Sequence, residues 1–175
     1  MSSADYASET LAGMNVQQVI RDVAHGGVSV PPEYTDVAPG LRAVVTDAQQ
    51  EGLELSVVVV PHDQWGMKLG SAIAYPERLR DLSTAVGESE GGTVLTLGPA
   101  QIGTYSDSLS RFTLESAENA VQHPRSPELT VAAQRFVDEV GQDQFPWTAV
   151  SAVLLVLVVI VVAGGTVLNV RRARG

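Results

Sequence analysis

An uncharged apolar stretch near the C-terminus, Thr148 to Val170, constrains this chain more than any other feature of its sequence. As an α-helix its 23 residues would extend about 34 Å, and the hydrocarbon core of a bilayer is about 30 Å thick. Phe145 and Trp147 precede the stretch, and three arginines follow it. Such flanks are typical of a membrane-spanning helix. The sequence therefore predicts one transmembrane helix at 148–170 and a basic tail at 171–175.

The charges are divided unevenly between the two sides of residue 144. All 20 acidic residues lie before it, with eight of the 11 basic ones, so this part carries −12 and the tail carries +3. An acidic domain is repelled by phosphate backbones, which argues against a nucleic-acid partner. Its length suits one domain with its own core. Because the chain has no cysteine, disulfides, thiolate zinc sites and a cysteine nucleophile are excluded.

Two signals conflict over which side of the membrane the domain occupies. The arginines after the stretch place the C-terminus in the cytoplasm by the positive-inside rule, and hence the domain outside the cytoplasm. Residues 1–14, however, have no basic start, apolar run or cleavage site of a signal peptide. The outside orientation is favoured, and a tail-anchored protein that faces the cytoplasm is the alternative.

Hydrophobic periodicity and capping residues predict five helices between residues 15 and 141. Asn15 caps the first, Pro76 begins the third, Ser110 caps the fourth, and Ser126 with Pro127 begins the fifth. Gly52 and Gly87 are predicted to end the second and third helices. The first helix is expected from residue 16 until His25, Gly26 and Gly27 end it, and the others at 39–51, 76–87, 111–122 and 127–141.

Four short apolar runs predict strands. LELSVVVV at 53–60 and TVLTL at 93–97 are β-branched and apolar, as buried central strands require. A helix separates them, so they are expected to pair in parallel through a right-handed crossover. Residues 28–30 predict an edge strand that prolines end, and 102–105 predict a strand in a hairpin with 93–97. The order describes an α/β sandwich, with helices on both faces of a mixed sheet of about four strands.

Four segments, LELSVVVVP, GGTVLTLGP, IGTYSDS and TLESAENAV, together with the C-terminal stretch, resemble an actinobacterial family of short single-pass membrane proteins of unknown function. The resemblance runs from about Asn15 to the C-terminus. Genes of that family often lie beside genes for secreted peptidoglycan endopeptidases. The residue patterns predict a domain organisation of a flexible N-terminus at 1–14, a TPM-like α/β domain at 15–141, a linker at 142–147, the span at 148–170 and the basic tail at 171–175.

More distantly, the order of elements resembles the TPM domain, whose members are commonly anchored to membranes. TPM domains usually enter the strand equivalent to 93–97 through an Asp-Asn-Gly turn, whereas this chain has Glu90, Gly91 and Gly92 there. This difference weighs against the acid phosphatase activity or divalent-cation binding that the TPM name implies.

A ligand site in an open α/β sheet is expected beyond the carboxyl ends of the parallel strands. His62 and Asp63 follow the first central strand, and Ser106 and Asp107, with Ser108 and Ser110, are expected nearby. His62 and Asp63 could serve as a base and the group that orients it, or as ligands of Ca²⁺ or Mg²⁺. The alternative is a solvated loop, since adjacent residues rarely point at one atom.

Trp65 suggests a different use of the same loop, because an aromatic residue beside Met67 is a composition found at protein contacts. No nucleophile elbow, zinc motif, kinase signature or Walker motif occurs in the sequence, so no catalytic residue and no cofactor are predicted. The sequence thus favours a non-enzymatic binding or regulatory module, tethered to a lipid bilayer and acting on a protein partner in the cell envelope. The alternatives are the TPM-type enzyme and a cytoplasm-facing adaptor.

Overall fold

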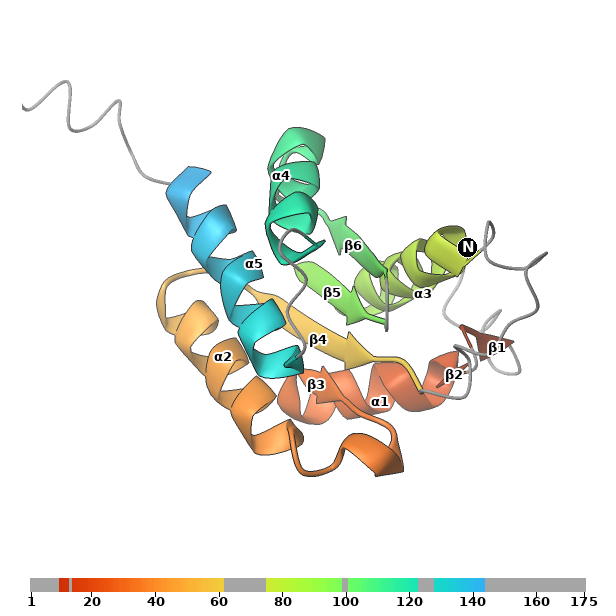
Figure 1. Ribbon diagram of the computed structural model, residues 1–175. Coiled ribbons are helices and arrows are strands. Elements are labelled where there is room, and N and C mark those ends of the chain that lie inside the picture. The colour runs from red at the N-terminus through yellow and green to blue at the C-terminus, as the bar shows by residue number, and fades with distance from the viewer. Residues whose placement is uncertain (1–9, 13, 62–74, 99–100, 123–127, 144–175) are drawn as a thin grey trace, which may run out of the picture. The chain divides into compact units, whose positions relative to one another are not determined.

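The computed structural model describes residues 10–12, 14–61, 75–98, 101–122 and 128–143 (Figure 1). The chain divides into two compact units, 1–141 and 142–175, and the fold below is that of the first unit. Its helices are α1 (Val16–Gly26), α2 (Ala38–Gln50), α3 (Tyr75–Glu90), α4 (Arg111–Gln122) and α5 (Leu129–Asp143), with a 3₁₀ turn η2 (Pro32–Tyr34). Its strands are β1 (Thr10–Leu11), β2 (Met14–Asn15), β3 (Val28–Ser29), β4 (Leu55–Val59), β5 (Thr93–Leu97) and β6 (Ile102–Ser106).

Four of the strands form one mixed sheet in the order β3-β4-β5-β6. β3, β4 and β5 are parallel, and β6 returns antiparallel to β5. The structure confirms the parallel pairing of the two central strands, the hairpin and the edge position of β3. The sheet has four strands and is mixed, as expected. The helix between β4 and β5 returns the chain to the end of the sheet at which β4 began, so β5 runs parallel to β4. The β5–β6 connection is too short for such a return, so β6 runs antiparallel to β5.

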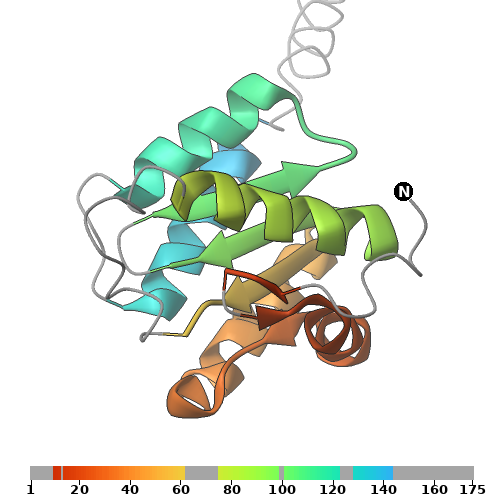
Figure 2. The ribbon, with the colours of Figure 1, turned by 90° about the vertical axis from the view of Figure 1, so that its right-hand side faces the viewer.

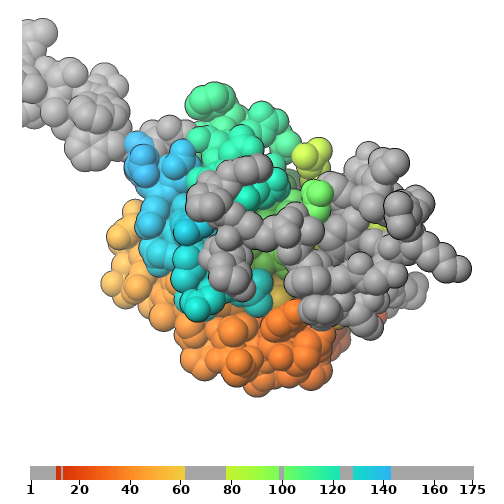
Figure 3. Space-filling view, viewed as in Figure 1, coloured from red at the N-terminus to blue at the C-terminus, as the bar shows by residue number. Residues whose placement is uncertain are grey.

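Helices cover both faces of the sheet (Figures 1 and 2). Alternate residues of β4 divide between two cores, because successive side chains of a strand point to opposite faces. Leu55, Val57 and Val59 pack in the core beneath α2, α4 and α5, whereas Val58 and Val60 pack with α1 and α3. The helices α2, α4 and α5 form part of the face seen in Figure 3.

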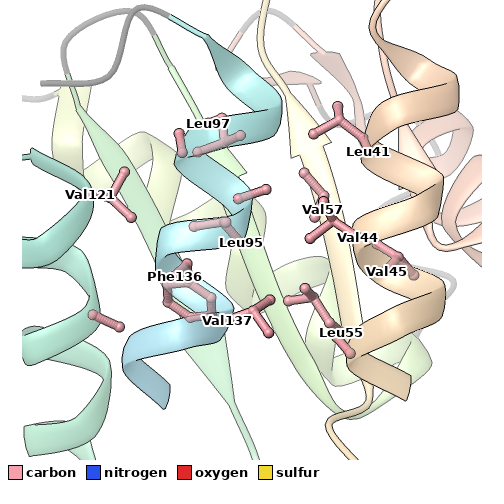
Figure 4. Packing of buried hydrophobic residues seen from close by; sticks show 14 of the residues in the cluster. Leu41, Val44, Val45, Leu55, Val57, Leu95, Leu97, Val121, Phe136 and Val137 are labelled. Carbon is pink, nitrogen blue, oxygen red and sulfur yellow. The ribbon is translucent and has the colours of Figure 1, made fainter. Parts of the chain in front are cut away.

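The apolar stripe predicted on the last helix is the centre of the larger core. Phe136 is fully buried, and Figure 4 shows it with Val137 on α5, both facing the sheet that carries Leu55 and Leu95. Ala132, Ala133 and Val140 of the same stripe are also buried. The stripe therefore packs on the sheet, as its spacing indicates.

Local capping signals define several helix ends as predicted. The Asn15 side chain accepts a hydrogen bond from the Gln18 N–H at 2.9 Å, and Ser110 Oγ accepts one from the Thr113 N–H at 3.1 Å. Gly27 ends α1 in the left-handed conformation, with φ of 68°. Side-chain acceptors of this kind satisfy the N–H groups that a helix N-terminus leaves without partners.

The predicted end of the third helix at Gly87 is wrong. α3 continues through Gly87 to Glu90, because the glycine serves tertiary packing there. The ring of Tyr105 lies against Gly87, so close that an added Cβ would be 2.0 Å from ring atom Cδ1. The glycines that end the helix are the next two, Gly91 and Gly92, whose φ values are positive.

Four smaller differences from the sequence prediction concern two short elements and two helix boundaries. Residues expected to be flexible include β1, which pairs with β2 in an antiparallel ribbon. The 3₁₀ turn η2 was not predicted. α2 begins one residue earlier than expected, and α5 continues past Gly141 to Asp143, the start of the predicted linker.

In the described part of the chain, no helix combines the length and apolarity that crossing a bilayer demands. The predicted span at 148–170, the tail at 171–175 and the linker beyond Asp143 lie outside the described residues.

Candidate functional site

The structure describes only two of the five residues predicted for the site. His62, Asp63 and Trp65 lie outside the described residues. Ser106 pairs with Thr93 at the start of β5, so Ser106 and Asp107 lie at the amino ends of the parallel strands. Pro61 follows β4 at the opposite, carboxyl end of the parallel strands, about 13 Å away along a five-residue strand. The fold thus separates Ser106 and Asp107 from Pro61.

Ser106 and Asp107 have clear partners within the fold. Ser106 Oγ is 2.9 Å from Thr93 Oγ1 and accepts hydrogen bonds from the N–H groups of Ser108, at 3.2 Å, and Leu109, at 3.0 Å. One carboxylate oxygen of Asp107 accepts from the Gly92 N–H at 3.0 Å. These bonds join the end of β6 to the turn between α3 and β5, so both side chains hold turns together.

This structural role makes a prediction for Asp107. Asp107→Ala should lower the free energy of unfolding by about 1 kcal/mol, because the Gly92 N–H loses its acceptor. Asp107→Asn keeps an oxygen acceptor and should cost less. Urea unfolding of the detergent-solubilised chain, followed by circular dichroism, measures both. An alanine variant as stable as the wild type would contradict the structural role.

Two hollows adjoin each other at the C-terminal end of α1, and both are lined by His25 and Gly26. The first, here the β4 hollow, has a volume of about 650 Å³ and lies where β4 begins. Its polar lining comes mainly from Thr46, Gln49, Glu54, Ser56 and Glu90. Two carboxylates without a facing lysine or arginine in this lining make the β4 hollow suited to cationic or hydrogen-bonding groups.

The second, here the β3 hollow, has a volume of about 540 Å³ and lies beside the edge strand, between α1 and the start of α2. Both hollows have charged and apolar walls, but only the lining of the β3 hollow includes an arginine. Its lining residues are Asp22, His25, Gly26, Val28, Val30, Thr35, Ala38, Pro39 and Arg42.

Hydrogen bonds order the α1 side of the β3 hollow. His25 Nδ1 lies 2.7 Å from the Arg21 carbonyl oxygen, and therefore carries the proton of that bond and leaves Nε2 for other partners. Asp22 accepts from Ser29 Oγ at 3.1 Å and from Gln18 Nε2 at 2.7 Å. Asp22 thus ties α1 to β3 and forms a fixed negative wall of the hollow.

The opposite wall carries a positive charge. Arg42 is exposed on α2, and its Nε lies 3.7 Å from the position that a Cβ on Gly26 would take. Among the described residues its guanidinium has no hydrogen-bond or ion-pair partner. In η2 nearby, burial and, secondarily, the charge of Glu33 raise the pKa of Tyr34 above its ordinary value, so Tyr34 is neutral at physiological pH.

The described residues contain no group of three histidine or acidic side chains placed to hold a metal ion. What the two hollows offer is charge, hydrogen bonds and apolar walls, which suit binding. No motif in the sequence marked Asp22 or Arg42 as a site residue. The signal that was present is the His-Gly-Gly end of a helix running directly into an edge strand that prolines terminate.

The described residues form a small α/β sandwich with two adjoining hollows at the C-terminal end of α1. The chain belongs to the family described as Membrane protein Rv1476, which it matches over residues 9–175. It is 35% identical to Membrane protein Rv1476 of Mycobacterium tuberculosis over 162 residues, which cover 92% of this chain and 79% of that protein. No solved structure matches the chain.

These comparisons confirm the resemblance to an actinobacterial family of membrane proteins and support a membrane location.

Proposed function

We propose that this protein is a single-pass, membrane-tethered binding or regulatory module of the cell envelope, without catalytic activity of its own. Its TPM-like domain would stand outside the cytoplasm and bind a protein partner. The binding role is supported by a contrast between the predicted site residues that the structure describes and the β3 hollow. Ser106 and Asp107 are used to hold turns together, whereas the β3 hollow presents an arginine that has no partner among the described residues.

The membrane half of the proposal is supported by three findings. The family is one of membrane proteins, residues 148–170 carry no charge, and the chain before residue 144 holds every acidic side chain. A domain with a net charge of −12 stays in solution beside an anionic bilayer, because like charges repel. The basic tail favours a cytoplasmic C-terminus.

Peptidoglycan hydrolase machinery is our proposed setting for the partner. This part of the proposal rests on the resemblance drawn from the sequence, in which genes of the family lie beside genes for secreted peptidoglycan endopeptidases. A tethered protein without hydrolytic residues of its own would act there by holding or restraining an enzyme.

A fractionation experiment tests the membrane tether. After lysis without detergent and high-speed centrifugation, the chain should sediment with the membranes. A double variant, Val156→Lys with Ile160→Lys, should leave most of it in the supernatant, because each central lysine costs about 2.5–3.5 kcal/mol of insertion. Wild-type chain in the supernatant would overturn the tether and the envelope role that depends on it.

Protease treatment of wall-stripped intact cells tests the orientation. The proposal expects the domain to be digested while a cytoplasmic marker stays intact. A fully protected domain would instead support the tail-anchored, cytoplasm-facing adaptor.

The catalytic alternative has its own test. Phosphatase turnover by the full chain that disappears on Asp63→Ala, or saturable Ca²⁺ or Mg²⁺ binding with the same dependence, would support the TPM-type enzyme or cation-binding protein. Either result would overturn the proposal of a non-enzymatic module. Asp107→Ala is the matched carboxylate control, since Asp107 is engaged in a turn.

A further inference from the structure

The β3 hollow lies along the free edge of the sheet. Among the described strands, β3 is the outermost in the sheet and pairs with β4 alone. The ladder between them begins with the Val57 N–H, which donates to the Gly27 carbonyl at 2.8 Å. The parallel register then pairs Val28 with Val57 and Ser29 with Val58. In such a ladder the groups that bond to β4 belong to Gly27 and Ser29, which flank Val28.

The main-chain groups of Val28 consequently face away from β4. In a trans peptide unit the C=O of one residue and the N–H of the next point in opposite directions. Because the Gly27 C=O points to β4, the Val28 N–H points to the free edge, and the Val28 C=O follows it in extended backbone. Among the described residues, neither group has a hydrogen-bond partner.

Burial raises the free-energy cost of leaving the N–H and C=O groups of Val28 without hydrogen bonds. Val28 is only 4% exposed, and the surface left to it lines the β3 hollow. A buried N–H or C=O without a partner costs about 1–3 kcal/mol, so a ligand that supplies both a donor and an acceptor gains more here than on an open surface. An extended polypeptide offers both groups on a single residue, at the spacing of a β-bridge.

The walls of the hollow suit the side chains of such a segment. Val28, Val30, Ala38 and Pro39 give it apolar surface. The guanidinium of Arg42 offers a charge-assisted bond to a carboxylate. Asp22 is already engaged by Gln18 and Ser29, so its negative charge works against a second acidic side chain at its own end of the hollow.

We propose that the β3 hollow is a docking site for an extended peptide segment of a partner protein, which adds to β3 by pairing with the main chain of Val28 and places a carboxylate against Arg42. This inference rests on the proposed function, whose protein partner it describes more closely. It makes the edge strand, and not the loop that holds Trp65, the contact surface.

A peptide library tests the docking site directly. Random eight-residue peptides displayed on phage are selected on the full-length chain in detergent micelles. We expect enrichment of sequences that contain an acidic residue and β-branched neighbours. A synthetic peptide from this pool should slow hydrogen exchange of the Val28 amide at least tenfold, and its N-methylated counterpart, which cannot pair through its main chain, should not.

Two pairs of variants separate docking from general effects on the fold. Thr35→Trp fills the β3 hollow and should weaken peptide binding at least tenfold, whereas Thr46→Trp fills the β4 hollow and should not. Each threonine is exposed and donates one hydrogen bond at 2.8 Å to a carbonyl oxygen, so the two substitutions cost similar bonds. Arg42→Gln should weaken binding about tenfold, and Arg111→Gln on α4 should leave it unchanged.

Three results would overturn the docking site. They are an absence of enriched peptides, equal binding to the Thr35→Trp variant, and unchanged exchange at Val28 on saturation. Because these measurements use purified chain, they are separate from the fractionation and protease experiments. A chain that sediments with membranes yet selects no peptide contradicts the docking site alone, and a chain found in the supernatant contradicts the proposed function.

Discussion

Replacing Gly103 with alanine is expected to lower the free energy of unfolding by about 3 kcal/mol. Gly103 lies on β6, directly against the backbone of α3. An added Cβ would be 2.5 Å from the carbonyl carbon of Leu79, 2.6 Å from its oxygen and 2.7 Å from the Arg80 nitrogen. These are main-chain atoms, which cannot rotate away as a side chain can. The helix would therefore have to move off the sheet, at the expense of the core that Leu79 and Leu82 share with β4.

Gly141→Ala is the matched control for this substitution. Gly141 lies in the last turn of α5, where nothing lies within 4 Å of an added Cβ. Alanine is favoured over glycine in helices by about 0.8–1.0 kcal/mol, less near a helix end, so this variant should be as stable as the wild type or slightly more so. Urea unfolding of both chains in the same detergent gives the comparison. Equal stabilities would show that α3 does not pack on β6 as described.

Phe136→Ala should lower the free energy of unfolding by about 3–5 kcal/mol, because a large buried ring is replaced by a cavity. Phe136 has no exposed surface and lies where α5 packs on the sheet (Figure 4). The neighbouring Val137 and Leu95 belong to rigid elements and can fill only part of the space. Urea unfolding should show the loss with cooperative unfolding retained.

Phe112→Ala removes the same group from a different environment. Phe112 lies in the first turn of α4 and is 75% exposed. Its substitution should change the stability by no more than about 0.5 kcal/mol. The difference between the two phenylalanine variants measures burial, since the chemical change is identical. A loss at Phe112 as large as that at Phe136 would contradict the described packing.

The elements that could be predicted are those whose signals are local. The periodic apolar residues of α1 and α5, the caps at Asn15 and Ser110, and the apolar run of β5 all lie where expected. In each case the side chains that define the element are a few residues apart, so their spacing in the sequence is enough to predict it. The parallel pairing of β4 and β5 could also be predicted, because two strands of one sheet that are joined by a crossover helix run in the same direction.

Gly87 shows where local reasoning is insufficient. A glycine after an amphipathic run is a common helix end, but here it makes room for the ring of Tyr105 on β6, 18 residues along the chain. The place of Ser106 and Asp107 depends on the hairpin. Both residues were grouped with His62 in the predicted site, but β6 runs antiparallel to β5, as the predicted hairpin requires, and therefore ends at the amino ends of the parallel strands.

By itself the sequence determined the α/β class, the order of the five helices and of the four strands of the mixed sheet, the acidic character of the domain and the uncharged stretch at 148–170, because composition and short-range spacing are properties of the chain alone. Only the tertiary structure decided that Gly103 has no room for a side chain beneath α3, that Asp107 holds a turn, and that Val28, whose main chain has no partner in the described part of the chain, lines a hollow beside Arg42. Those properties depend on which distant segments lie against each other and in which register. Their physical cause is close packing, which appears only when the sheet and its helices have come together.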